Sequence, residues 1–286
     1  MAQIAIYRNN LLDNLREDRV CTAFGIKIIP TGEIVQIAKQ AGYGSLFIDL
    51  EHTTLTLKDA SQLCITGLCA GITPFVRVPH ECGSGFIQRV LDGGAMGIIV
   101  PHILGVGMAV KSVENDHGAN YMIEDARKVI QTSKFPPLGK RSLTAGLPHF
   151  GYAPTPATAT APQLNESGST VFIMIETADA LETVDDIAAL PGCDVLLVGA
   201  NDLATELGIM GDFDHPKFMQ ALEKVSNASK THNKVFAIGG LYHRPDLMDR
   251  VVNDLGARWV IGGQDVGMLV NATRQNCLAL KAIQRS

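Results

Sequence analysis

Eight short apolar segments, each followed by a helix-forming segment, recur along the chain. The apolar segments are nearly continuous, which is expected of strands buried on both faces of a parallel sheet. They occupy residues 21–29, 45–50, 73–78, 96–100, 171–176, 194–198, 234–238 and 258–261. Helices are expected at 31–40, 57–69, 85–91, 123–132, 179–189, from 203, from 216, at 245–255 and at 266–283.

Eight strand–helix units without a linker-like break predict an α/β fold, a single-domain (β/α)8 TIM barrel over residues 1–286. A doubly wound open sheet is the alternative, but that fold usually carries a GxGxxG turn after its first strand. The sequence here reads GIKIIP at 25–30 instead. The barrel is therefore the favoured architecture.

Composition excludes several classes of protein. Of the 286 residues 46% are hydrophobic, and the formal net charge is −5. A disordered chain needs lower hydrophobicity, and a nucleic-acid partner would need a basic excess. The longest apolar stretch, 95–110, contains Pro101 and His102 and is too short for a membrane span. With no signal-like N-terminus and six scattered cysteines, we expect a cytoplasmic protein with reduced thiols.

Two irregular stretches interrupt the pattern. One follows the fourth strand and forms an atypical insert at about 103–122, far longer than a usual βα connection. It is either a loop near the active-site mouth or a translated intron. The other, 136–169, is rich in Pro, Thr, Ala and Gly, and we expect it at a strand exit as a lid or substrate loop.

Candidate catalytic groups follow the predicted strands, because barrel active sites lie at the carboxyl ends of the strands. Glu176 and Asp202 follow neighbouring strands. Two converging carboxylates repel each other unless a cation lies between them, and hard oxygen ligands suit Mg²⁺ or Mn²⁺. The alternative is that both carboxylates only stabilise the starts of the following helices.

Three further groups are candidates at the same end of the barrel. Arg77 ends an apolar strand, and it either holds an oxyanion or pairs with a carboxylate of the second strand. His52 follows Asp49 by three residues, as in a general base oriented by a carboxylate, or it is an ordinary loop histidine. Lys27 is the only candidate for a Schiff base. The glycine pairs at 239–240 and 262–263 leave a phosphate site open.

Five motifs taken together resemble the HpcH/HpaI aldolase family, including relatives of the macrophomate synthase kind. They are FIDLEH at 47–52, VRVP at 76–79, FPPLGKRS at 135–142, IET at 175–177 and VGANDL at 198–203. The resemblance covers nearly the whole chain. One departure is Ala200, where many relatives have proline, and another is Met174, where many have glutamine.

The resemblance implies a class II aldolase that cleaves 4-hydroxy-2-oxo acids to pyruvate and an aldehyde through a metal-bound enolate. Glu176 and Asp202 would hold Mg²⁺, Mn²⁺ or Co²⁺, and Arg77 would stabilise the enolate oxygen. The turn at Gly199, Asn201 and Asp202 would bind the substrate carboxylate, and His52, oriented by Asp49, would move the proton. It also implies a homo-oligomer that exchanges helix 266–283. The alternatives are an oxaloacetate decarboxylase resembling macrophomate synthase and a catalytically idle barrel that binds a ligand.

Overall fold

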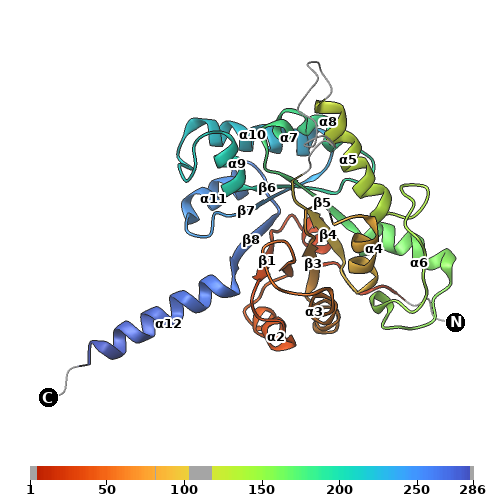
Figure 1. Cartoon of the computed structure of the whole chain (residues 1–286), viewed down its shortest axis with the longest axis horizontal. Coiled ribbons are helices and arrows are strands. Elements are labelled where there is room, and N and C mark those ends of the chain that lie inside the picture. The colour runs from red at the N-terminus through yellow and green to blue at the C-terminus, as the bar shows by residue number, and fades with distance from the viewer. Residues whose placement is uncertain (1–4, 81, 103–117, 284–286) are drawn as a thin grey trace.

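The strands of the protein form a closed parallel barrel in the order of the sequence, as the computed structural model shows (Figure 1). The structure describes residues 5–80, 82–102 and 118–283. Because β8 pairs with β1, the barrel prediction is confirmed and the open-sheet alternative is wrong. The strands are β1 (Cys21–Ile26), β2 (Ser45–Asp49), β3 (Thr73–Arg77), β4 (Gly97–Val100), β5 (Thr170–Ile175), β6 (Val195–Gly199), β7 (Val235–Gly239) and β8 (Trp259–Gln264).

Helices cover the outside of the barrel. They are α2 (Gly32–Gln40), α3 (Leu57–Ala70), α4 (Ser84–Asp92), α5 (Gly118–Ser133), α7 (Ala178–Glu182), α8 (Val184–Ala189), α9 (Ala200–Glu206), α10 (Pro216–Thr231) and α11 (Pro245–Asn253). The helix after β8, α12 (Asp265–Lys281), does not belong to this layer. Local sequence sets their ends: α3 begins with a capping box between Thr56 and Asp59 and ends at Gly71, whose φ is 73°. The helix expected at 179–189 is divided into α7 and α8 at Thr183.

Hydrophobic side chains pack in two layers, one between the sheet and the helices and one inside the barrel. The inner layer is built on Phe75, Phe172 and Trp259, whose ring centroids lie 4.8–6.1 Å apart. The indole nitrogen of Trp259 donates to Ser45 Oγ at 3.0 Å, so this buried polar group is satisfied. The barrel is therefore filled, and ligands have access only at its ends.

The amino ends of the strands are closed by segments that the hydrophobic pattern did not predict. These are α1 (Asn10–Arg16), α6 (Ala157–Gln163), η1 (Pro148–Phe150) and η2 (Leu164–Gly168). Asn10 of α1 donates to the carbonyls of Gly44 and Gly71, in the turns that precede β2 and β3. Only Leu11 of α1 is buried, and one buried residue gives no helical period to detect.

The stretch at 136–169 lies at this closed end of the barrel, which corrects our expectation of a lid at a strand exit. His149 Nε2 lies 2.9 Å from the carbonyl oxygen of Ala95, just before β4. Arg141 pairs with Asp92, at the carboxyl end of α4. The physical reason is topological: the stretch connects a helix to the next strand, and such connections lie at the amino ends of the strands.

Most of the predicted insert lies outside the described residues, which resume at 118. Residues 118–122 belong to the backbone of α5, which therefore begins five residues before the expected helix at 123–132. The bounds of the insert, its origin as a loop or a translated intron, and the single domain over residues 1–286 stay predictions.

The last helix, α12, points away from the barrel (Figure 1). Asp265 is its one buried residue within the described chain, and it anchors the helix to the turn after β1. Within the described ranges, we find no helix with the length and hydropathy that a bilayer crossing requires.

Candidate active site

Charged side chains gather where the carboxyl ends of the strands meet, and we call this end of the barrel the mouth. They follow the order of the strands: Lys27 after β1, Asp49, Glu51 and His52 at β2, Arg77 at β3, His102 after β4, Glu176 after β5 and Asp202 after β6. Side-chain contacts link the groups from β1 to β5 in an unbroken series. The mouth therefore brings together the residues that the sequence placed at separate strand ends.

Asp49 and Arg77 form a bidentate ion pair. Arg77 Nε and Nη2 donate to the two carboxylate oxygens of Asp49 at 3.0 and 2.8 Å. Burial disfavours the ionised form of Asp49, but the hydrogen bonds and charge of Arg77 outweigh it, so the pKa of Asp49 lies below its usual range. Arg77 therefore has the partner that our alternative interpretation assigned to it, and Asp49 fixes the orientation of the guanidinium.

Glu51, and not Asp49, is the carboxylate beside the His52 ring. Asp49 Oδ1 accepts the backbone N–H of His52 at 3.4 Å, whereas His52 Nε2 lies 3.5 Å from Glu51 Oε2. The expected orientation of the imidazole by Asp49 is thus not what the structure shows. The reason is that Arg77 and Lys27 already hold the Asp49 carboxylate inside the mouth, while the His52 side chain is 55% exposed.

Glu51 also links the two sides of the mouth. Arg77 Nη1 lies 3.1 Å from Glu51 Oε2, and this contact is an ion pair without hydrogen-bond geometry. On the other side, His102 Nε2 lies 3.7 Å from Glu51 Oε1. Sequence reasoning assigned no role to Glu51 or His102, although both follow strand ends, which was the available signal.

Glu176 is buried, and within the described chain only one of its carboxylate oxygens is bound. Its Oε1 accepts the backbone N–H of His102 at 2.6 Å and lies 3.3 Å from His102 Nδ1. This contact holds His102 at a φ of 44°, in the left-handed region. Burial raises the pKa of Glu176, and the nearby charge of Asp202 adds to this effect, although His102 and Arg77 oppose it.

The turn from β6 into α9 supplies the rest of this side of the mouth. Gly199 ends β6, and Asn201 and Asp202 lie exposed in the first turn of α9. A Cβ on Gly199 would come within 2.5 Å of Glu176 Oε2, so a larger residue would occupy the space in front of that oxygen. The predicted substrate-binding turn thus lies directly beside the predicted metal ligand.

These residues fit a divalent cation. Glu176 Oε2 is buried and has no hydrogen-bond partner among the described residues. A buried acceptor of this kind is costly unless a donor or a cation satisfies it. No group of three or more His, Cys, Asp or Glu side chains suited to a metal occurs in the described ranges. Two carboxylates, completed by water and substrate, are nevertheless a usual set for Mg²⁺.

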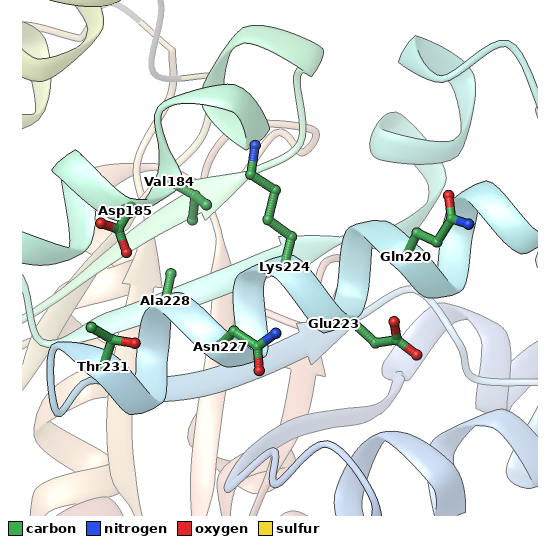
Figure 2. A pocket seen from close by; sticks show the side chains of 8 residues that line it. All are labelled: Val184, Asp185, Gln220, Glu223, Lys224, Asn227, Ala228 and Thr231. Carbon is green, nitrogen blue, oxygen red and sulfur yellow. The ribbon is translucent and has the colours of Figure 1, made fainter.

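Two surface grooves lie outside the mouth. One runs between α8 and α10 and is lined by Val184, Asp185, Gln220, Glu223, Lys224, Asn227, Ala228 and Thr231 (Figure 2). The other lies between the start of α2 and α3. No mouth residue lines either groove, so neither groove belongs to the candidate site.

Fold and site together define a class of protein, a (β/α)8 enzyme with carboxylates, an arginine and histidines at the mouth. Residues 31–272 match the HpcH/HpaI aldolase/citrate lyase family, and the chain belongs to that family. It is a carbon–carbon lyase.

Two relatives that match this chain over nearly its whole length are aldolases. The chain is 43% identical to a 4-hydroxy-4-methyl-2-oxoglutarate aldolase of Hapsidospora irregularis and 40% identical to one of Chaetomium globosum, over 97% of each chain in both comparisons. The crystal structure of an HpcH/HpaI aldolase from Desulfitobacterium hafniense DCB-2 has a TM-score of 0.81 at 24% identity, over 97% of this chain and 98% of that one. Macrophomate synthase shares the fold, with a TM-score of 0.72 at 22% identity over 98% and 92% of the two chains.

Proposed function

We propose that the protein is a divalent-metal-dependent aldolase that cleaves 4-hydroxy-2-oxo acids to pyruvate and a second carbonyl compound. The observation that carries the proposal is the buried Glu176 Oε2, which has no partner in the described chain and faces Gly199. A buried carboxylate oxygen without a partner in the described chain, at the mouth of a barrel from a family of lyases, favours a cation, because a positive charge beside it offsets the cost of burying the carboxylate.

Glu176 and Asp202 would hold the metal ion, Mg²⁺, Mn²⁺ or Co²⁺. When bound, such an ion acts as a Lewis acid toward the 2-oxo and carboxylate groups of the substrate. The backbone N–H groups at Asn201 and Asp202 would bind the substrate carboxylate, with Gly199 leaving room beside Glu176. These assignments keep the roles that the family resemblance implies.

The remaining mouth residues would bind oxygen atoms and move the proton. Arg77, held rigidly by Asp49, presents its charge where negative charge develops on the 2-oxo oxygen. His52 takes the proton of the C4 hydroxyl, with Glu51 as its neighbouring carboxylate. The C3–C4 bond then breaks, its electron pair forms the pyruvate enolate, and C3 of that enolate is finally protonated.

The relatives that share 43% and 40% identity make 4-hydroxy-4-methyl-2-oxoglutarate the first substrate to test. Breaking its C3–C4 bond gives two molecules of pyruvate, one from each half. Decarboxylation of oxaloacetate would produce the same enolate and is the alternative reaction of this site.

A pyruvate-release assay tests the proposal. The panel contains 4-hydroxy-4-methyl-2-oxoglutarate, simpler 4-hydroxy-2-oxo acids and oxaloacetate, each with and without Mg²⁺, Mn²⁺ or Co²⁺. We expect metal-dependent release from the hydroxy acids. Release from oxaloacetate alone would favour the decarboxylase, and no release from any compound would favour an idle, ligand-binding barrel.

We also propose that the protein is a homo-oligomer in which α12 packs on a second copy of the chain. The helix exposes an apolar series, namely Met268, Leu269, Val270, Leu278 and Leu280. It extends away from its own barrel (Figure 1), and a helix with such a face is stabilised when that face is buried. Light scattering of the wild type and of Val270→Asp tests this, since a monomeric wild type would contradict it.

The six free cysteines support the expected cytoplasmic location.

A further inference from the structure

Lys27 lies at the mouth on the strand opposite the predicted metal ligand. We propose that Lys27 binds the distal carboxylate of a dicarboxylic 2-oxo acid and thereby selects this class of substrate. The inference rests on the proposed aldolase function and deepens it. Assays of ligand binding and of cleavage with Lys27 variants can distinguish the role of Lys27 from that of the metal site.

The backbone holds Lys27 in place before any ligand arrives. Its N–H donates to Asp265 Oδ1 at 3.0 Å, and the next two N–H groups, of Ile28 and Ile29, donate to Asp265 Oδ2 at 3.0 Å. Asp265 is buried and begins α12. The turn after β1 is thus fixed, and a fixed turn lowers the entropy that ordering a binding side chain would cost.

The side chain of Lys27 has unused capacity. Its Nζ lies 3.3 Å from Asp49 Oδ2, a longer contact than the roughly 2.7–2.9 Å of a strong charge-assisted hydrogen bond. An ammonium group has three donors. The side chain is 21% exposed, so a ligand in the mouth can reach it.

Two arginines near Lys27 and the mouth already form ion pairs with carboxylates of the chain. Arg77 contacts Asp49 and Glu51 through three nitrogens, and its side chain is 9% exposed. Arg244, in the connection from β7 to α11, forms ion pairs with Asp214 and Asp246. Lys27 is therefore the better candidate for a second substrate carboxylate.

The topology of the barrel gives the two ends of the substrate separate partners. β1 and β5 are four strands apart in a closed ring of eight, which places Lys27 across the mouth from Glu176. A substrate whose C1 carboxylate and 2-oxo group lie at the Glu176 side would extend its other end toward Lys27. This arrangement suits a five-carbon diacid better than a monoacid.

Titration calorimetry with two uncleavable ligands tests the inference in the Mg²⁺-saturated protein. 2-Oxoglutarate and 2-oxopentanoate have the same chain length and lack the C4 hydroxyl, but only the first has a distal carboxylate. We expect the wild type to bind 2-oxoglutarate at least tenfold more tightly, because hydrogen bonds to charged groups typically contribute this much. Lys27→Met should remove this preference and Lys27→Arg should retain most of it.

One control variant and one outcome separate the inference from its alternatives. Lys39→Met removes one positive charge at the far end of α2, where Lys39 contacts the Gly71 carbonyl, and should leave both affinities unchanged. Equal weakening of both ligands by Lys27→Met would overturn the inference and leave Lys27 as a partner of Asp49 only.

Cleavage distinguishes failure of the inference from failure of the function. Lys27→Met should raise KM for 4-hydroxy-4-methyl-2-oxoglutarate about tenfold more than KM for 4-hydroxy-2-oxopentanoate. Pyruvate release that is insensitive to Lys27→Met on both substrates would overturn the inference alone. A wild type that neither binds the ligands nor releases pyruvate would overturn both the inference and the function.

Discussion

The two ends of the barrel both bury charged side chains, but they satisfy them differently. At the closed end, Lys134 and Arg141 each pair with a carboxylate at 2.7 Å, that of Asp194 and that of Asp92. At the mouth, Asp49 is fully paired, whereas Glu176 has one oxygen without a partner among the described residues. Each of these closed-end cations thus has a carboxylate partner within the chain, whereas the Glu176 carboxylate at the mouth leaves one oxygen open to a ligand.

The unpartnered buried atoms at the two ends also differ in kind. At the closed end they are Arg141 Nε and Nη1, which are donors, and His149 Nδ1. The Nε2 of His149 lies 2.9 Å from a carbonyl oxygen and must carry the proton, while burial lowers the pKa of this histidine to about 4. His149 Nδ1 is therefore an acceptor. Among the described residues, the unpartnered atoms at the mouth are carboxylate oxygens of Glu51 and Glu176, which a donor or a cation can satisfy. Arg77 lies beside the Glu51 oxygen, so Glu176 Oε2 is the one open to a ligand.

The largest expected effect is a loss of pyruvate release on substitution at the mouth, compared with a matched substitution on the nearby surface. Glu176→Gln should lower pyruvate release about 10³-fold or more, because it weakens binding of the metal ion. As a Lewis acid, that ion stabilises the transition state by several kcal/mol. The unfolding midpoint should not fall, since a buried carboxylate is replaced by a neutral group of the same shape. Glu206→Gln, on the exposed end of α9, is the matched control and should leave release unchanged. A comparable loss of pyruvate release in both variants would contradict a special role for Glu176 at the mouth.

A second pair of substitutions compares one buried arginine from each end. Arg77→Lys and Arg141→Lys should each lose about 1–3 kcal/mol of unfolding free energy in urea, because lysine does not reproduce the donors of the guanidinium. Only Arg77→Lys should also lose about 10- to 100-fold in kcat/KM, since only Arg77 lies at the mouth. Equal losses of activity would contradict the structural role of the closed end.

The last effect concerns pH and the closed end. His149 stays neutral in the folded state until about pH 4, whereas the unfolded chain takes up this proton near the ordinary pKa of 6.5. The unfolded state then binds more protons, so stability should fall by roughly 3 kcal/mol from pH 6.5 to 4 through this residue. The stabilisation is fully present above pH 6.5.

Urea unfolding at several pH values, compared between the wild type and His149→Gln, isolates the effect of that histidine. Glutamine keeps a donor for the Ala95 carbonyl but does not titrate, so its curve should be flatter in this range. Identical curves would show that His149 is not held neutral.

The sequence predicted the barrel and the strand ends of the mouth because both follow from periodicity and from one topological rule. Glu176 and Asp202 follow their strands directly, so that rule alone places them at one end. Side-chain direction was beyond the sequence. Pairing of Arg77 with a carboxylate of the second strand was one alternative, but the spacing of Asp49 and His52 gave no sign that Glu51 would lie beside the imidazole. Composition likewise marked 136–169 as irregular, whereas its place after a helix fixed the end at which it lies.

The most direct test of the account is pyruvate release by the wild type after treatment with a chelator. The account predicts that release from 4-hydroxy-4-methyl-2-oxoglutarate disappears, returns on addition of Mg²⁺, Mn²⁺ or Co²⁺, and is unaffected by borohydride. Release that persists in the chelated protein, together with inactivation by borohydride in the presence of pyruvate, would contradict it. That result would assign the chemistry to a Schiff base on a lysine, with Lys27 the first to examine.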